Sequence, residues 1–484
     1  MSRSNSGGSE QTNSTDVGLP ADILLNFDRR DRRKLSEHLR HQLRAAIQQG
    51  RLSAGTVLPP SRTLASDLGV ARSVVVAAYE HLIADGYLDA RQGSGTQVLP
   101  IAPAAGHNSA AIGETGQNVR LIGGLPDPSL FPRSEWLQHY RTALHLVPHQ
   151  QLGYPGPQGA AALREALADY VSRVRGVAGS AGRMVITTGM TQAIVLVCRA
   201  LQSRGATAVA IEDPCFGFHR QAISSTGMRV VPIPVDDDGL LVEKLFEHEV
   251  NAILLSPAHS YPSGAVLSTS RRASLIAWAK RHDGLIIEDD YDAEFRYDRA
   301  PIGAIQGLDP ERVIYAGCAS KMLTPALRLG WALLPAQWVD PVVEQKLVDD
   351  MGTPLLEQLA LARFIESGAL TRHLRRVRPV YRRRRDRLLD TLKTALPGAE
   401  ISGVAAGLHV YVRLPPSCDE RRFIKAARDR GVFLEGASWH WSDSNSAPPA
   451  LVLGYGSISE SAIQTAISTL GSIVEPDSVH GDAP

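Results

Sequence analysis

Apolar residues recur every four positions near the start of the chain, and this spacing predicts an amphipathic helix. They are Leu35, Leu39, Leu43 and Ile47. The following stretch, LPPSRTLASDLGVARSVVVAAYEHLIADGYL, predicts a short helix from Ser61, a turn at Gly69 and a second helix from about Ala71. The apolar face of that second helix comprises Val75, Ala78, Tyr79 and Leu82. The segment YLDARQGSGTQV then predicts a small β-hairpin.

Two short helices with a tight turn and a following hairpin are typical of a winged helix-turn-helix, whose second helix enters the major groove of DNA. The side chains expected to contact double-stranded DNA stand at the starts of both helices and on the hairpin: Arg62, Thr63, Arg72, Ser73, Arg91, Gln92 and Gly93. A small helical protein-binding domain with solvated arginines would show the same pattern. The pattern alone therefore leaves both interpretations open.

The pattern changes from residue 120, where short apolar runs alternate with helix-spaced segments. The runs MVITTG, AVAIED, AILLSP, LIIEDDY and VIYAGC predict strands of a buried sheet in a large α/β domain. From about residue 400, GLHVYVRL and ALVLGYGS predict the strands of a smaller α/β subdomain. The overall fold class is therefore α/β, preceded by the N-terminal winged helix-turn-helix.

Polar and proline-rich stretches divide the chain into domains. Residues 1–20 and 476–484 hold few apolar groups and predict disordered tails. Residues 21–98 form the predicted DNA-binding domain, residues 99–119 a linker, and residues 120–475 the large domain.

Composition narrows the class of protein. The chain has 484 residues, 44% hydrophobic content and a formal net charge of +1, so a surface that binds nucleic acid must be local. The four cysteines are scattered without a CxxC pair, which indicates a reducing compartment and no structural zinc site. No apolar run is long enough to span a bilayer. We therefore expect a cytoplasmic protein without a membrane segment.

Polar groups follow two of the predicted strands, where a parallel sheet normally places its ligand site. Asp289 and Tyr291 end the first strand, Ser320 and Lys321 follow the second, and Arg328 comes seven residues later. Pyridoxal 5′-phosphate needs a lysine amine for its Schiff base, an acidic partner for its ring nitrogen and donors for its phosphate. The alternative is an ion pair of Asp289 with Arg328 that holds two loops together.

Each of these residues has a predicted role toward pyridoxal 5′-phosphate. Lys321 forms the Schiff base, Asp289 holds the proton of the ring nitrogen, and Tyr291 donates to the ring oxygen. Ser320 and Arg328 bind the phosphate, Arg328 as a two-pronged donor. A helix N-terminus would bind phosphate as well, and its candidate residues are Gly189, Met190 and Thr191.

The segments EDDYDAEFRYD and SKMLTPALRLGW resemble signatures of the MocR/GabR group of bacterial regulators, which have a domain like fold-type I aminotransferases. The resemblance covers nearly the whole chain, and LPPSRTLASDLGVARSVVVAAYEHLIADGYL resembles the GntR winged-helix family. It implies a homodimer in which Tyr154 reaches the phosphate of the partner subunit. It also implies that Phe216 stacks on the cofactor ring and that His259 lies near the ring oxygen. Local packing of Tyr154 and a core position for Phe216 are the alternatives.

Two positions depart from ordinary aminotransferases. Their NPxNPTG asparagine falls near Tyr261, and Val452 stands where an xRLG arginine usually binds the substrate carboxylate. With the helix-turn-helix, Val452 favours a transcription regulator that senses a metabolite over an aminotransferase with an accessory DNA-binding domain. The complete set of Asp289, Lys321 and Arg328 argues against a scaffold that has lost the cofactor.

The effector is a small molecule, and the resemblance offers two kinds. One is pyridoxal phosphate itself, acting as cofactor and signal in the control of vitamin B6 synthesis, as in a PdxR-like member. The other is an amino compound such as GABA, taurine or an ectoine product. Val452 favours the first. The basic run from Arg372 to Arg387 predicts a solvated helix face or, alternatively, a supplementary DNA contact.

Overall fold

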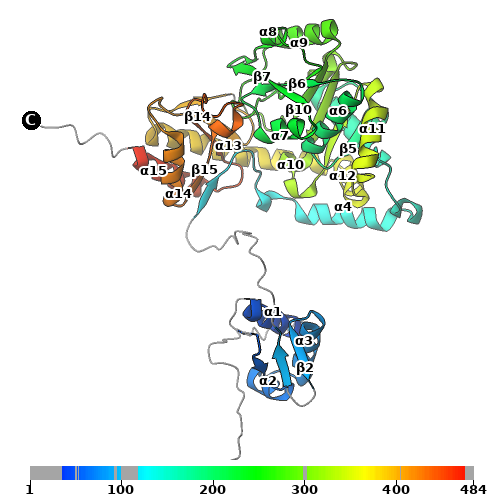
Figure 1. Cartoon of the computed structure of the whole chain (residues 1–484), viewed down its shortest axis with the longest axis vertical. Helices are drawn as coiled ribbons and strands as arrows, with labels where there is room; N and C mark the ends of the chain where they lie inside the picture. Colours follow the sequence, from blue (N-terminus) through cyan, green and yellow to red (C-terminus); the bar gives the residue numbers. More distant parts are fainter. Residues whose placement is uncertain are drawn as a thin grey trace, which may run out of the picture. The chain divides into compact units, whose positions relative to one another are not determined.

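The computed structural model describes residues 35–48, 52, 54–91, 95–99, 118–297, 302–403 and 405–474. By its contacts the chain divides into two compact units, residues 1–113 and 114–484, whose elements are labelled in Figure 1. Both predicted tails and most of the predicted linker lie outside the described residues, as do Gln92 and Gly93.

The N-terminal unit is the predicted winged helix-turn-helix. Its elements are α1 (Leu35–Gln48), β1 (Val57–Leu58), α2 (Ser61–Leu68), α3 (Arg72–Ala84), β2 (Leu88–Arg91) and β3 (Gly95–Val98). The three strands form an antiparallel sheet in the order β1-β3-β2. Gly69 ends α2 in the left-handed conformation, with φ at 63°, which turns the chain into α3.

The core of this unit confirms the predicted apolar faces. Val75, Ala78, Tyr79 and Leu82 of α3 are all buried in one cluster with residues of α1 and of the sheet. The Tyr79 hydroxyl donates a hydrogen bond of 3.0 Å to the Pro59 carbonyl, which ties α3 to the segment before α2. The two helices of the motif are therefore held by burial on one face, which leaves the other face to solvent.

The large domain is built on an eight-stranded sheet in the order β5-β12-β11-β10-β9-β6-β7-β8. Its strands are β5 (Met184–Thr187), β6 (Ala208–Asp213), β7 (Arg229–Asp236), β8 (Gly239–Leu240), β9 (Ala252–Leu255), β10 (Leu285–Asp290), β11 (Val313–Cys318) and β12 (Gly330–Leu333). The pairs from β11 to β7 are parallel, whereas β12 runs antiparallel to both β11 and β5. The carboxyl ends of β10 and β11 therefore lie side by side.

Helices cover both faces of this sheet. The helices of this domain include α4 (Arg133–Leu146), α5 (Ala161–Arg175), α6 (Met190–Ser203), α7 (Gly217–Ser225), α8 (Val242–Leu245), α9 (Thr269–His282), α10 (Ala319–Met322), α11 (Ala336–Asp350) and α12 (Leu355–Glu366). One buried cluster joins α6, α7 and α11 to the sheet, and another joins α8 and α9 to it from the other side. Because the strands are buried on both faces, they appear in the sequence as continuous apolar runs.

The smaller subdomain has a five-stranded sheet in the order β13-β14-β16-β15-β4. Its elements are β4 (Val119–Leu121), β13 (Glu400–Ser402), β14 (His409–Arg413), α14 (Glu420–Asp429), β15 (Val432–Gly436), β16 (Ala450–Gly454) and α15 (Glu460–Val474). The strand β4 pairs in parallel with β15, so the chain enters this unit through the smaller sheet. Sequence order alone gave no indication of this pairing, because β4 is separated from β15 by the whole large domain.

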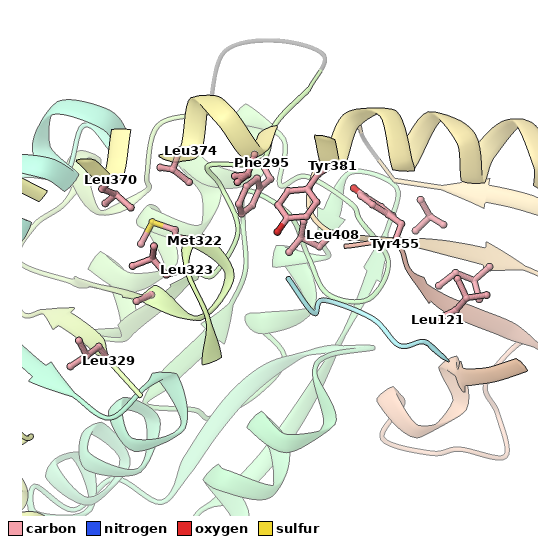
Figure 2. Close-up of a cluster of buried hydrophobic side chains, with 14 of the residues drawn as sticks. Leu121, Phe295, Met322, Leu323, Leu329, Leu370, Leu374, Tyr381, Leu408 and Tyr455 are labelled. Carbon is pink, nitrogen blue, oxygen red and sulfur yellow. The ribbon is translucent and has the colours of Figure 1, made fainter. Parts of the chain in front are cut away.

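A long helix, α13 (Ala369–Ala395), joins the large domain to the smaller one. Figure 2 shows Leu370 and Leu374 of α13 beside Met322 and Leu323, with Tyr381 further along the same helix near Phe295. The Tyr381 and Phe295 rings lie 5.3 Å apart, edge to face. One continuous core therefore supports α10, the short helix that contains Lys321.

Candidate ligand site and DNA-binding surface

Lys321 lies on a single helical turn directly after a buried strand. The strand β11 ends at Cys318, and α10 begins at the next residue. Met322 is buried, and its carbonyl lies 3.0 Å from Nε2 of His373. This contact ties the turn to α13, the helix that contains His373. A Cβ atom built on Gly124 would lie 3.3 Å from the Lys321 Nζ. The lysine amine therefore lies against the loop Gly123–Gly124, named the glycine loop below.

Asp289, at the end of β10, is 4% exposed and has an incomplete set of partners. Its Oδ2 accepts a hydrogen bond of 3.4 Å from the Ser256 hydroxyl and lies 3.9 Å from Nδ1 of His219. Its Oδ1 is buried and has no hydrogen-bond partner among the described residues. Burial and the neighbouring Asp290 and Asp292 raise the pKa of Asp289 to about 8, and Lys321 opposes this shift.

An unpaired buried acceptor is unfavourable, and a donor from a ligand would remove its desolvation penalty. A protonated ring nitrogen is such a donor, and its positive charge would also stabilise the Asp289 carboxylate. Beside a lysine amine, this orphaned Oδ1 fits the requirements of a pyridoxal ring. The residues present at the two strand ends therefore fit the cofactor.

Asp290 points away from Asp289, as successive residues of a strand do. Its carboxylate forms a buried ion pair with Arg175, with 2.6 Å between Nε and Oδ2. The Tyr315 hydroxyl donates a further hydrogen bond of 2.7 Å to Oδ2. The alternative prediction, an ion pair of Asp289 with Arg328, is wrong for the described residues, because Asp289 faces His219 and Arg328 faces Gly189.

His219 is a site residue that the sequence reasoning missed. It lies in the first turns of α7, three residues after Phe216, and its ring is buried. Burial and the charge of Lys321 lower the pKa of His219 to about 4, so the ring beside Asp289 is neutral at pH 7. The motif FGFHR contained the only signal, a polar residue on the first turn of a helix that begins at a strand end.

Phe216 is partly buried among aromatic side chains at the start of α7. Its ring lies 5.3 Å from the ring of Tyr261, edge to face, and is nearly parallel to the His440 ring at 6.4 Å. Tyr291 and His259 also lie together, with 3.1 Å between the Tyr291 hydroxyl and Nδ1 of His259. The same Nδ1 lies 2.9 Å from Oδ2 of Asp292, a second partner that the sequence did not indicate.

The predicted phosphate-binding groups lie at the N-terminus of α6. Arg328 follows a 3-10 turn in the left-handed conformation, and its Nη2 would lie 3.1 Å from a Cβ atom on Gly189. Gly189 precedes α6 with φ at 132°, a conformation that favours glycine. Met190 and Thr191 are the first residues of α6, where N–H groups lack partners within the helix. A guanidinium beside such N–H groups is a favourable arrangement for binding an anion.

Tyr154 and Ser320 complete the predicted set. Ser320 is partly buried on α10 next to Lys321. Tyr154 is 86% exposed, so it does not pack into the site of its own chain.

Val452 stands where aminotransferases usually have the arginine that binds the substrate carboxylate, and its neighbour is another carboxylate. Val452 is buried on β16 and pairs in register with Glu435 of β15. Glu435 Oε2 accepts a hydrogen bond of 3.0 Å from the Gly123 backbone N–H, and its Oε1 lies 3.1 Å from Nε2 of His440. A Cβ atom on Gly123 would meet the Tyr261 hydroxyl at 2.6 Å and Val452 at 2.8 Å. The glycine loop thus packs against a carboxylate and a valine.

In the N-terminal unit, the predicted DNA contacts of both helices are exposed. Arg62 and Thr63 lie in the first turn of α2, and Arg72 and Ser73 are the first two residues of α3. Arg72 Nε lies 3.4 Å from the Ser61 hydroxyl, so the first residues of the two helices are in contact. Arg91 ends β2, on the hairpin expected to act as the wing.

The basic run lies on α13 and is divided between two environments. Arg384 pairs with Asp127 at 2.7 Å, and Arg378 donates a hydrogen bond of 2.8 Å to the Glu294 carbonyl. The side chains of Arg382 and Arg383 are 63% and 60% exposed. Part of the run therefore anchors the helix, and the rest is the solvated face that the sequence predicted.

Comparison with known proteins agrees with both units. Residues 35–98 match the bacterial regulatory proteins of the gntR family, and residues 130–438 match the aminotransferase class I and II family. None of the helices in the described part of the chain has the length and apolar character that a membrane span requires.

Relatives match over almost the whole chain. The HTH-type pyridoxine biosynthesis transcriptional regulator PdxR of Corynebacterium glutamicum is 30% identical over 461 residues, which is 94% of this chain and 99% of PdxR. The probable rhizopine catabolism regulatory protein MocR of Rhizobium meliloti is 31% identical over 476 residues, which is 93% of this chain and 95% of MocR.

The large domain is also similar to solved aminotransferases. A kynurenine aminotransferase of Pyrococcus horikoshii superposes with a TM-score of 0.68 and 26% identity, covering 74% of this chain and 91% of that enzyme. That structure was solved in complex with PMP. The fused gntR and aminotransferase domains, together with relatives of the same organisation, show that the chain belongs to the MocR-type transcriptional regulators.

Proposed function

We propose that this regulator binds pyridoxal 5′-phosphate covalently at Lys321 and that occupancy of the site controls DNA binding by the winged helix. The proposal depends above all on the buried Oδ1 of Asp289, which has no donor among the described residues although it lies at the strand end next to the lysine turn. When bound, the cofactor supplies a reactive carbonyl and a ring that withdraws electrons.

Each residue then has a defined part. Asp289 accepts the ring N–H, the Ser256 hydroxyl donates to that carboxylate, and the neutral His219 ring packs beside it. Tyr291 and His259 contact the ring oxygen, while Phe216 packs on the ring. The phosphate is held by Arg328 and Ser320 and by the first turn of α6, which comprises Gly189, Met190 and Thr191.

We further propose that the large domain forms a homodimer in the cytoplasm. Four leucines in and after α4 are about half exposed or more, which is unusual for a monomer surface: Leu137, Leu144, Leu146 and Leu152. The exposed Tyr154 follows them directly and would reach the partner's phosphate site. The cysteines are all free, as expected in a reducing compartment. Two DNA-binding units per dimer predict an operator with two half-sites.

The signal that we propose first is pyridoxal phosphate itself, with vitamin B6 synthesis as the regulated process. The similarity to a pyridoxine biosynthesis regulator and the valine at position 452 both support it. An amino compound is the second candidate signal. Transaminase turnover of common amino acids should be weak or absent, because Val452 cannot hold a carboxylate to orient the substrate.

The test of cofactor attachment is absorption of the purified protein, followed by borohydride reduction and mass spectrometry. The wild type and the Lys280→Ala variant, whose changed lysine is 61% exposed, should both become covalently labelled. The Lys321→Ala variant should remain unlabelled. Label retained in Lys321→Ala would overturn the assignment.

The regulatory part of the proposal has a separate test. Binding of a fragment from the protein's own promoter region is measured with and without added pyridoxal phosphate. The apparent Kd of the wild type should change, and that of Lys321→Ala should not respond. An equal response of both proteins would contradict a signal that acts through Lys321.

A further inference from the structure

The corner of the site beside the glycine loop contains a carboxylate that belongs to the protein. Glu435 Oε2 accepts a hydrogen bond from the backbone N–H of Gly123. A backbone N–H is the kind of donor that would otherwise bind a ligand carboxylate. Gly124, the next residue, lies against Lys321 Nζ. The Glu435 carboxylate and the Lys321 amine therefore lie against adjacent residues of one loop.

The other side of Glu435 is closed as well. Its Oε1 lies 3.1 Å from Nε2 of His440, whose side chain is fully buried. Nδ1 of His440 is buried without a hydrogen-bond partner among the described residues. The Glu435 side chain itself remains 20% exposed. Both oxygens of this carboxylate therefore have a partner, although the side chain is not fully buried.

The pairing of strands explains why this carboxylate lies beside Val452, the position where aminotransferases usually have the arginine that binds the substrate carboxylate. Glu435 and Val452 are partners in the register of β15 and β16. Val452, Glu435 and the Tyr261 hydroxyl all lie within 3.2 Å of the point where a Cβ on Gly123 would be. A valine offers no cation for a ligand carboxylate, and the glutamate adds a like charge.

We propose that Glu435 occupies the place of a ligand carboxylate, so that the ligands admitted to Lys321 are amines without a carboxylate next to the amine. The inference rests on the proposed attachment of pyridoxal phosphate and adds the ligand class to it. Specificity then comes from an element that repels the wrong ligand, because an amino acid would bring a second anion beside Glu435, which already accepts the Gly123 N–H. Free lone pairs of Glu435 would accept hydrogen bonds from a second ammonium group of the ligand.

A simpler role for Glu435 is to tie the glycine loop to β15. In that case its removal would lower stability without changing the choice of ligand. The two roles therefore differ in a measurable ratio of affinities, and a matched pair of ligands reports it. The pair is the reduced adduct of pyridoxal phosphate with ethylamine and the reduced adduct with L-alanine, which differ only by the carboxylate.

Both adducts are titrated by calorimetry into the full-length Lys321→Ala protein, which has no lysine to compete for the site. The ethylamine adduct should bind at least roughly tenfold more tightly, the difference expected from one desolvated pair of like charges. Adding Glu435→Gln, which keeps the size of the side chain, should reduce the ratio to about threefold or less. The control Glu400→Gln, on the edge strand β13, should leave it unchanged.

A third variant sharpens the test. Glu435→Gln combined with Val452→Arg places an arginine where aminotransferases usually have one. This variant should bind the alanine adduct more tightly than the ethylamine adduct. Equal affinities of the two adducts for the Lys321→Ala protein, in which Glu435 is unchanged, would overturn the inference even if the further variants did not fold. So would a ratio that Glu435→Gln leaves unchanged. Failure of both adducts to bind would instead refute the proposed cofactor site itself.

Discussion

The two functional regions of this regulator are built in opposite ways. Arg62 and Arg72 of the winged helix are exposed, at the first turns of helices whose other faces are buried. In the large domain, Asp289 and His219 are buried. They lie close together although Asp289 is on the strand β10 and His219 is on the helix α7. The predicted DNA contacts therefore lie on the surface of a folded core, whereas the candidate ligand site is part of the core.

This difference separates binding from stability. An exposed arginine contributes little to folding, so its loss should change affinity alone. A buried charged group contributes through its partners, and its loss should change stability as well as binding. Substitutions in the two regions should therefore give two distinct patterns, and each of the following experiments tests one of them.

The largest effect on stability is expected at the ion pair below the ligand site. Arg175→Leu leaves the Asp290 carboxylate buried at 3% exposure, with the Tyr315 hydroxyl as its only donor among the described residues. Breaking a buried pair by removing one partner costs roughly 3–5 kcal/mol. Denaturant unfolding of the cofactor-free protein should show this loss.

The matched control is Arg183→Leu in the same domain. Arg183 pairs with Glu311 at 2.7 Å, with side chains 32% and 53% exposed, and loss of such a pair costs about 0–1 kcal/mol. If both substitutions lowered the free energy of unfolding equally, burial would not be what distinguishes the two pairs.

Asp289→Asn should move stability and binding in opposite directions. The pKa of Asp289 is raised from 3.8 to about 8 in the ligand-free fold. The folded protein therefore holds a proton that the unfolded chain releases above pH 4, and its stability falls as pH rises toward 8. The asparagine removes this dependence, so the cofactor-free variant should be more stable than the wild type by roughly 1–3 kcal/mol at pH 8.

The same variant should bind pyridoxal phosphate more weakly and change its absorption, because the ring nitrogen loses its charged partner. Near pH 4 the two proteins should unfold at the same denaturant concentration. The control Asp283→Asn changes a carboxylate that is 97% exposed, and it should alter neither property. The difference in stability between Asp289→Asn and the wild type should therefore grow from pH 4 to pH 8. A difference that stayed constant would show that Asp289 does not change its protonation in the folded protein over this range.

The sequence predicted the exposed region better than the buried one. Periodicity located both helices of the winged motif and the apolar face of α3, because a motif of contiguous residues fixes which positions are outside. The ends of apolar runs also indicated Asp289 and Lys321 as candidates, because both stand at the end of a buried strand or directly after it. Their roles toward a cofactor stay predictions.

The sequence could not indicate groups that meet through long-range pairing. Glu435 reaches Gly123 because β15 pairs with β4, and these strands are separated by about three hundred residues of chain. His219 reaches Asp289 only because β6 leads into α7 two strands away from β10. Such contacts depend on strand order, which local patterns do not determine.

In the exposed region, the larger effect is expected at Arg72. It is the first residue of α3, the position that meets base edges when this helix lies in the major groove. Arg72→Ala should weaken operator binding by roughly 1–3 kcal/mol and relax discrimination at one or two base pairs. Unfolding of the protein should not change. Competition titrations with single-base operator variants measure the discrimination, and equal losses on all sequences would assign Arg72 to the backbone.

Arg62→Ala should have the smallest effect on DNA affinity. The effect should also differ in type from that of Arg72→Ala, because it should not depend on the DNA sequence. Arg62 is the second residue of α2, the helix that crosses the DNA backbone in this geometry, and it is exposed. Loss of one phosphate contact should weaken binding to every sequence alike and lower the salt slope by about one unit. Alanine is a favourable helix residue, so the stability of α2 should be kept. A salt series on operator and unrelated DNA measures both slopes. If Arg62→Ala weakened only operator binding, Arg62 would contact bases and not the backbone. If it changed neither the affinity nor the slope, α2 would not contact DNA, and a protein partner would fit this face better.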